Sequence, residues 1–462
     1  MADLVIAHAY VASMAPDRHV VPDGAIAIEG SRIVAVGPTD RILAEHRALR
    51  VIDATDMLAV PGLIDVHFHP NQYLSNGVGD DVDIHTWLFD RVYPYESVIT
   101  PEEAYWSALG AFAEAIRYGT TCFNDPGGIH PDATAEAALS IGIRGIVNRS
   151  TRDVFDETAP IPDNLKEDTE TNLREAERVL RTWHGVGDGR LRAWTSLRHV
   201  FDTSDALCLG IGELARRFGV GIQCHAAAFK GENEMCVAQL GKRPLRRLHD
   251  LGLFGPNLLL VHMGFPDASE IDLLRRHDVK VAHCPSASML GGYGVIHAGM
   301  IPKMVEAGVT VALGTDAAAA GGHHDMVRAM YLAACAHKDT YADATLMGAC
   351  RALEMATVEG ARACLWDDEI GSLESGKKAD IVLFDMSGLD WHAGRHPIGN
   401  LVYSATGRSA DTVIIDGRMV LRHGVLLTVD ETHLKRELAR ASAAWRHRAA
   451  VDIPSPWPTR TD

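Results

Sequence analysis

Short apolar runs alternate with longer amphipathic stretches through the middle of the chain. The stretches at 101–118, 166–183 and 268–277 are helical in pattern. The apolar runs lie at 58–66, 120–124, 144–148, 191–197, 219–224, 257–261, 279–282 and 309–314. Eight buried-type strands that alternate with helices over roughly 300 residues predict an α/β fold, a (β/α)8 barrel of the TIM type.

A doubly wound parallel sheet is the alternative architecture for this alternation. Its nucleotide-binding versions carry a GxGxxG or GxxxxGK[ST] segment between a strand and a helix. No such segment follows any of the apolar runs. The barrel is therefore the favoured interpretation.

The two ends of the chain show strand-and-turn patterns instead. Residues 25–37 form two apolar runs around a glycine-containing turn, and similar patterns return at 379–385 and 412–420. We predict that these end segments pair into one small β-sandwich beside the barrel. The predicted units are the sandwich parts at 1–57 and 366–430, the barrel at 58–365, and a C-terminal helix with an irregular tail at 431–462.

Composition and charge restrict the partners of the chain. The hydrophobic fraction of 47% and the charged fraction of 23% are typical of a globular protein. The 44 basic and 61 acidic residues give a net charge of −17, which disfavours nucleic acid as a partner. No apolar run reaches the roughly 18 residues of a membrane span, and no secretory signal is recognisable. The eight scattered cysteines lack a CxxC pair, so we expect reduced thiols in a cytoplasmic protein. The partner that we expect is a small-molecule substrate.

Histidine and aspartate side chains follow the predicted barrel strands. The C-terminal ends of the strands meet at one rim of such a barrel, where its chemistry is located. His67 and His69, two residues apart after the first strand, share one face. The later strands end in His225 (fifth), His262 (sixth), His283 (seventh) and Asp316 (eighth). Imidazole and carboxylate groups bind Zn²⁺, Fe²⁺, Co²⁺ or Mn²⁺, so the rim predicts a metal site, with His283 interpreted as a packing residue.

The order of these motifs resembles the amidohydrolase superfamily, in its cytosine deaminase and s-triazine hydrolase branch. The motifs are PGLIDVHFH from residue 61, LVH from 260, HCP from 283 and GTD from 314. The resemblance covers essentially the whole chain, including the split sandwich. It implies a homo-oligomer. It also implies that a divalent metal, zinc first and Fe(II) or Co as alternatives, is held by His67, His69, His225 and Asp316.

His262 is by the same resemblance either a fifth ligand or an acid–base group. Superfamily members with two metals bridge them with a carboxylated lysine at the end of strand four. The run at 191–198 contains no lysine. The expectation is therefore one metal per chain.

One departure from the branch concerns the substrate. Members typically carry a glutamate three residues after the strand-five histidine, where it protonates a ring nitrogen; here that position is Ala228. The nearest other acids are Glu232 and Glu234. A carbonyl needs no ring protonation, because the metal polarises its oxygen directly. This favours C–N or thiocarbamate cleavage at a urea, carbamate or amide, as in the phenylurea and molinate hydrolases.

Two alternatives remain beside carbonyl hydrolysis. The first is a deaminase or dechlorinase of a nitrogen heterocycle such as a triazine, pyrimidine or purine. The second is a non-catalytic scaffold, against which the complete ligand set argues. In either enzyme Asp316 acts as general base and then returns the proton to the leaving group, while His262 stabilises the developing oxyanion.

Five further residues are candidate substrate contacts. Gln72 follows the first metal pair, and Trp87 belongs to an aromatic segment that suits a pocket wall or, alternatively, core packing. Asn124 ends the second strand, and Arg198 ends the fourth, where an ion pair with a loop carboxylate is the alternative role. His324 follows Asp316 together with His323, and surface loop positions are the alternative for both.

Overall fold

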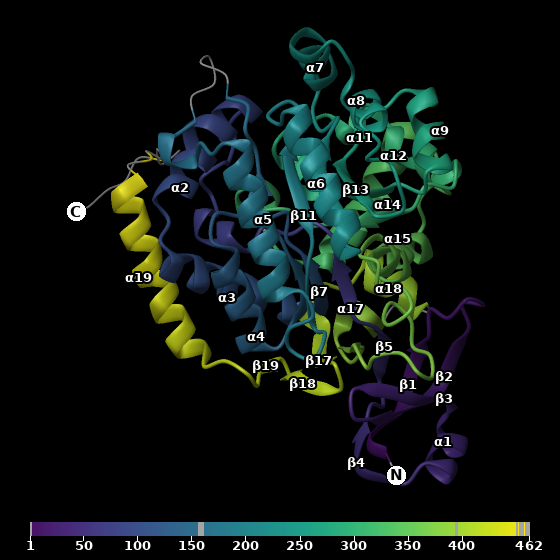
Figure 1. The fold of residues 1–462 in the computed structure, drawn as a ribbon. Helices are drawn as coiled ribbons and strands as arrows, with labels where there is room; N and C mark the ends of the chain where they lie inside the picture. The colour runs from purple at the N-terminus through teal and green to yellow at the C-terminus, as the bar shows by residue number, and fades with distance from the viewer. Residues whose placement is uncertain (1, 156–160, 393–395, 450, 452–456, 458–462) are drawn as a thin grey trace.

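The computed structural model describes residues 2–155, 161–392, 396–449, 451 and 457 (Figure 1). Its centre is a closed barrel of parallel strands surrounded by helices, which confirms the predicted fold. The barrel strands are β6 (Leu63–Asp65), β7 (Thr120–Asn124), β8 (Arg144–Val147), β10 (Leu191–Ala193), β11 (Thr195–His199), β12 (Ile222–Ala226), β13 (Leu258–His262), β14 (Lys280–His283) and β15 (Val311–Leu313), with the short β9 (Ser150–Thr151) beside β11. The single strand predicted at 191–197 is divided into β10 and β11, which together form the fourth of the eight positions.

Hydrogen bonds between the first and last strands close the barrel. The backbone N–H of Val66 donates to the carbonyl of Leu313 at 3.1 Å. The buried Asp65 carboxylate accepts from the Thr315 hydroxyl at 2.5 Å and from the Thr315 backbone N–H at 3.0 Å. Because these contacts lie just before the segments that carry His67 and Asp316, they bring the two ends of the barrel sequence together.

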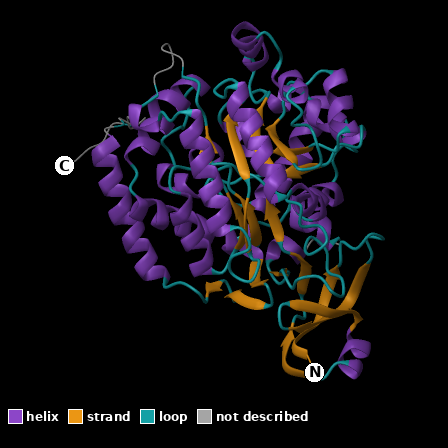
Figure 2. Cartoon of the chain, viewed as in Figure 1, coloured by secondary structure: helices purple, strands orange, loops and turns teal. Residues whose placement is uncertain are grey.

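Most of the helices cover the outside of the barrel or extend its loops, while the first packs on the strands near the N-terminus (Figure 2). They are α1 (Thr39–Glu45), α2 (Tyr93–Val98), α3 (Pro101–Arg117), α4 (Pro131–Ile141), α5 (Thr169–Trp183), α6 (Asp205–Phe218), α7 (Glu232–Leu240), α8 (Pro244–Asp250), α9 (Ala268–Arg276), α10 (Pro285–Leu290), α11 (Val295–Ala298), α12 (Met300–Glu306), α13 (Ala318–Gly321), α14 (Met326–Tyr341), α15 (Ala349–Ala356), α16 (Val358–Ala363), α17 (Leu389–His392), α18 (Pro397–Tyr403) and α19 (Glu431–Ala449). Short helical turns of other types are η1 (Pro70–Ser75), η2 (Thr86–Val92), η3 (Asp163–Leu165) and η4 (Gly407–Ser409).

The end segments pair into one sheet below the barrel, at the lower right of Figure 2. Hydrogen bonds join all nine strands into a single sheet, in which β16 pairs with β5 and so connects the two end segments. The strands are β1 (Ala2–Ala12), β2 (Val20–Glu29), β3 (Arg32–Pro38), β4 (Ala48–Asp53), β5 (Met57–Pro61), β16 (Ile381–Asp385), β17 (Ala410–Ile415), β18 (Arg418–Arg422) and β19 (Val425–Leu426).

The apolar run at 58–66 is two strands rather than the one predicted. Strand β5 belongs to the end sheet, and β6 belongs to the barrel. Gly62 separates them, at a point where any Cβ would collide with the Thr121 side chain of β7. Periodicity alone does not reveal this change of sheet, because both strands are buried on both faces.

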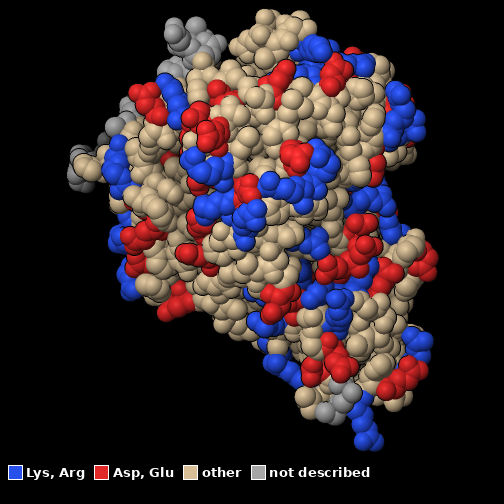
Figure 3. Space-filling model, viewed as in Figure 1, with Lys and Arg blue, Asp and Glu red and all other residues tan. Residues whose placement is uncertain are grey.

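The C-terminal helix α19 packs along α3 and α2, at the left of Figure 1. Trp445 is fully buried there, with its ring centroid 4.9 Å from that of Tyr95. The prediction of a helix in this segment is confirmed, while the tail prolines at 454, 456 and 458 lie outside the described residues. None of the described helices is both long and apolar enough to cross a membrane. Acidic and basic side chains are interspersed on the face seen in Figure 3.

Candidate metal centre and substrate pocket

The five predicted metal ligands come together at the C-terminal rim of the barrel. His67 Nε2 and His69 Nε2 each lie 3.4 Å from Asp316 Oδ1, and His262 Nε2 lies 3.7 Å from Asp316 Oδ2. His225 joins the same group, because its ligand atom lies within 4.8 Å of those of His67 and His69. Strand ends from both halves of the barrel thus contribute to one cluster.

Burial favours the neutral, metal-binding form of three imidazoles in this cluster. Burial lowers the pKa of His69 and His225 well below the usual range, and it lowers that of His262 to about 4. Burial by itself raises the pKa of Asp316, but the neighbouring His67 and His262 outweigh it and hold that pKa well below its usual range. Neutral imidazoles beside an ionised carboxylate are suited to a divalent cation.

Neighbouring groups orient two of the imidazoles. His67 Nδ1 lies 2.9 Å from Gln223 Oε1, while the Gln223 amide donates to the Val66 carbonyl. His225 Nδ1 lies 2.6 Å from the carbonyl of Arg198. These contacts assign the proton of each ring to Nδ1 and leave Nε2 as the ligand atom, which is the usual arrangement around a metal.

The side chains present fit a zinc ion. His67 Nε2 is buried and makes no hydrogen bond with the described residues. Two atoms bound about 2.1 Å from one zinc ion at a tetrahedral angle lie about 3.4 Å apart. His67 Nε2 and His69 Nε2 lie at that separation from Asp316 Oδ1. The backbones of His262 and Asp316 have φ angles of +73° and +68°, which are strained conformations typical of functional sites.

A cavity of about 40 Å³ lies directly against the metal cluster and is called the metal pocket below. Trp87 is one of its wall residues, with Nε1 donating to the Ala319 carbonyl at 3.0 Å. Arg198 is another. Its lining residues are His69, Ile84, Trp87, Leu88, Arg198, His199, His225, Ala228, Phe229, His262, Tyr293 and Asp316.

Three of the candidate substrate contacts lie outside this lining. The Gln72 amide donates to Glu96 Oε1 at 2.9 Å, and Asn124 Oδ1 accepts from Asn148 at 3.4 Å. His324 is fully buried, with Nδ1 3.1 Å from the Thr315 hydroxyl and its ring 4.3 Å from that of Phe68. The surface position considered for it and for His323 is wrong, because both are buried.

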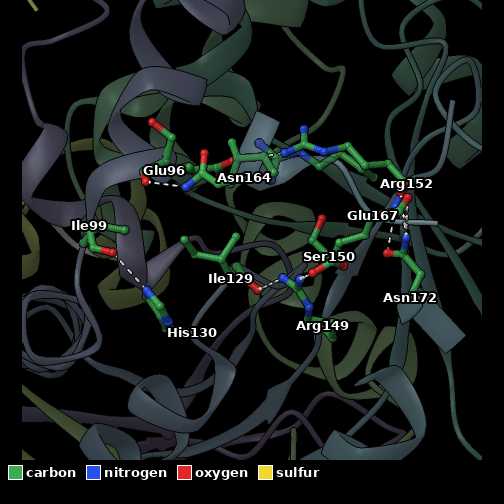
Figure 4. A pocket seen from close by; sticks show the side chains of 14 residues that line it. Glu96, Ile99, Ile129, His130, Arg149, Ser150, Arg152, Asn164, Glu167 and Asn172 are labelled. Atoms are coloured by element: carbon green, nitrogen blue, oxygen red, sulfur yellow. Dashed lines mark hydrogen bonds and ion pairs between the residues drawn. The ribbon is translucent and has the colours of Figure 1, made fainter. Parts of the chain in front are cut away.

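Arg198 makes the ion pair that was its alternative role. Its Nη1 lies 3.1 Å from Glu96 Oε1 of α2, and both side chains are buried. Arg152 lies on the other side of the same carboxylate, 3.8 Å from Oε2. Behind Arg198 these groups line a polar cavity of about 300 Å³, shown in Figure 4. Glu96 could not be predicted as part of the site, since a lone glutamate in an aromatic segment carries no signal of its own.

The structure separates the two acids considered as substitutes for the missing glutamate. Glu232 is fully buried, yet it accepts from the Ala228 backbone N–H at 2.5 Å and does not line the metal pocket. Glu234 is exposed. His199, which sequence analysis missed, does line the pocket, and its Nδ1 lies 2.9 Å from Asp202 Oδ2. A histidine directly after the strand-four arginine was the available signal.

We expect Glu232→Gln to change how stability depends on pH. Burial raises the pKa of Glu232 to about 7 from its usual 4.5, so in the folded chain this carboxyl keeps its proton while the unfolded chain loses it. Its contribution to stability is therefore full below about pH 4.5 and is lost as the pH rises to about 7.

The Glu232→Gln variant retains an oxygen acceptor but does not titrate. Urea unfolding should show the variant gaining stability relative to the native chain, by about 2–3 kcal/mol, between pH 5 and pH 8. An equal difference at both pH values would contradict this.

The chain belongs to the amidohydrolase family, whose profile matches residues 58–420. A second profile, for a bacterial imidazolonepropionase-like composite domain, matches residues 24–48. The chain is 34% identical to a 5-methylthioadenosine/S-adenosylhomocysteine deaminase of Moorella thermoacetica, over 91% of this chain and 95% of that protein. It is therefore a metal-dependent amidohydrolase, an enzyme that hydrolyses carbon–nitrogen bonds.

Solved structures extend this likeness to the whole fold. An adenosine deaminase of Xanthomonas campestris with bound zinc superposes with a TM-score of 0.88 at 30% identity, covering 98% of this chain and 99% of that one. The zinc complex of the atrazine chlorohydrolase TrzN of Arthrobacter aurescens superposes with a TM-score of 0.87 at 23% identity, covering 95% and 100%. The names of the relatives favour the nitrogen-heterocycle alternative over the urea and carbamate substrates expected from Ala228.

Proposed function

We propose that this enzyme is an aminohydrolase that removes an exocyclic amino group from a purine-like nitrogen heterocycle. The observation that carries the proposal is the full-length similarity to deaminases, at 34% identity over 91% of the chain for one and 30% identity over 98% for another. In the reaction a C–O bond forms from water, the C–N bond to the amino group breaks, and ammonia leaves.

The proposed metal is one zinc ion, held by His67, His69, His225 and Asp316 with His262 beside them. When bound, zinc supplies Lewis acidity and lowers the pKa of a water ligand toward about 7. Asp316 accepts the proton of the attacking water and returns it to the departing amine. His262, whose Nε2 lies 3.7 Å from Asp316 Oδ2, donates a hydrogen bond to the developing negative charge.

Ring protonation is assigned to His199 in this proposal. The position three residues after His225 is Ala228, which has no proton to give. His199 faces the metal pocket, with its ring centroid 5.1 Å from that of His225. Burial holds the pKa of His199 below its usual range, although Asp202 at its Nδ1 opposes that shift. In this proposal the Asp202 carboxylate orients the His199 ring and supports its protonated form while a proton passes to a ring nitrogen of the substrate.

Hydrolysis of a urea or carbamate carbonyl is the second candidate, and Ala228 is the observation that favours it. Incubation of the zinc-loaded enzyme with adenine nucleosides, aryl ureas and carbamates, followed by product mass analysis, separates the two. Ammonia release from the nucleosides supports deamination. Free amine from the acyclic compounds, with the nucleosides untouched, overturns it in favour of the second candidate.

His199→Gln is expected to lower kcat for deamination by on the order of 10²-fold, because glutamine does not donate a titrating proton. His297→Gln, at an exposed side chain of helix α11, is the matched control and should retain the native rate. The pH profile supplies a second readout, since the loss of rate at rising pH, where His199 gives up its proton, should be absent in His199→Gln. A native rate in His199→Gln would remove this residue from the reaction.

A further inference from the structure

An apolar cavity of about 500 Å³ adjoins the metal pocket and is called the apolar cavity below. Its walls come from η2 and the residues on either side of it, from the segments after β9 and β11, and from α7 with the residues before it. The two spaces share three lining residues, Ile84, Leu88 and Phe229. The polar cavity of Figure 4 shares only Arg198 with the metal pocket among the lining residues described.

The metal pocket alone is too small for a substrate. Its volume of about 40 Å³ holds little more than the reacting group, whereas small-molecule sites measure about 300–1,000 Å³. A bound substrate must therefore extend into a neighbouring space. The apolar cavity has the larger volume and the wider shared wall.

The chemistry of the apolar cavity selects an apolar group. Phe89, Tyr93, Phe201 and Met235 line it in addition to the three shared residues. Asp202 is the one acid among its described lining residues, and that carboxylate already accepts from the His199 backbone N–H at 2.9 Å and contacts His199 Nδ1. The described lining residues include no lysine or arginine that could recognise an anionic substituent.

We propose that the apolar cavity is the subsite for a large apolar substituent, alkyl or aryl, next to the bond that is hydrolysed. The inference rests on the proposed function only in placing the reacting group at the metal cluster. It holds for either candidate reaction, since it concerns the part of the substrate that does not react.

Acyl hydroxamates test the subsite without any hydrolysis, because the hydroxamate group binds a divalent metal and the acyl tail probes the adjoining space. Each buried methylene strengthens binding about fourfold. Calorimetry on the zinc-loaded chain should therefore show hexanohydroxamate binding at least about 50-fold more tightly than acetohydroxamate. Succinyl monohydroxamate, whose tail is anionic, should gain nothing over acetohydroxamate.

Two tryptophan substitutions on α7 locate the tail. Met235→Trp fills the apolar cavity and should reduce the gain of hexanohydroxamate to less than about fivefold. Val237→Trp, at a side chain that is 46% exposed and outside the lining, should keep the native gain. No gain from the longer tail, or an equal gain in both variants, overturns the proposal. A gain from the anionic tail instead would assign the substituent to the polar cavity of Figure 4.

These outcomes are independent of the assay for the proposed function. Hydroxamate affinities report the shape of the space beside the metal, and product masses report which bond is hydrolysed. If the native enzyme fails to deaminate nucleosides but shows the tail effect, the proposed function fails and the subsite proposal stands. If the native enzyme deaminates nucleosides but shows no tail effect, the subsite proposal fails and the proposed function stands.

Discussion

Asp316→Asn is expected to lower kcat by on the order of 10³-fold on any substrate that the enzyme hydrolyses. The asparagine amide cannot accept the proton of the attacking water. It also removes the negative charge that lies 3.4 Å from two of the proposed ligand nitrogens, so zinc affinity should weaken as well. The measurement is kcat at saturating zinc together with the metal content by inductively coupled plasma analysis, which should give about one zinc per native chain.

The matched control for this prediction is Asp272→Asn, a solvent-exposed carboxylate on α9. It makes the same chemical change without touching the metal cluster, and it should keep the native kcat. If Asp316→Asn kept both the native kcat and one zinc per chain, Asp316 would have no role in proton transfer.

Arg144→Met is expected to destabilise the fold by about 3–5 kcal/mol. Arg144 is 1% exposed and lies between the barrel and the end sheet. Its Nε donates to Asp380 at 2.6 Å and its Nη2 donates to Asp416 at 3.2 Å. Methionine is uncharged, so it leaves the Asp380 carboxylate buried without its cationic partner, while Asp416 keeps Lys378 at 2.9 Å. Urea unfolding of the zinc-loaded protein at neutral pH measures the loss.

Arg181→Met tests whether the loss comes from burial. Arg181 pairs with Glu177 on the exposed face of α5, so its removal should cost less than about 1 kcal/mol. Adding Asp380→Asn to Arg144→Met should recover part of the lost stability, because it removes the buried charge that has lost its partner. Equal losses in the two single variants would mean that Arg144 contributes no more than a surface ion pair.

The barrel and the metal cluster could be predicted because both depend on local order along the chain. Buried strands appear as apolar runs, and the residue that ends each strand is placed at the rim whatever the loops do. His67, His69, His225, His262 and Asp316 all follow this rule, and the structure brings them together.

Contacts between segments that are far apart in the sequence could not be predicted in this way. Glu96 and Arg198 are 102 positions apart and meet only because α2 folds over the end of β11. Gln72 was expected at the substrate and instead donates to Glu96. The direction of a loop side chain depends on the packing of its neighbours, which no periodicity records.

The sequence by itself determined the α/β barrel, the order of its strands and the five side chains of the metal cluster, since strand periodicity and strand ends are local properties. Only the tertiary structure decided that Gly62 divides one apolar run between two sheets and that Glu232 turns to the backbone of Ala228. It also decided that η2 and α7 enclose an apolar cavity beside the metal cluster. These features arise where segments far apart in the chain exclude water together, and burial of that kind is a property of the assembled fold.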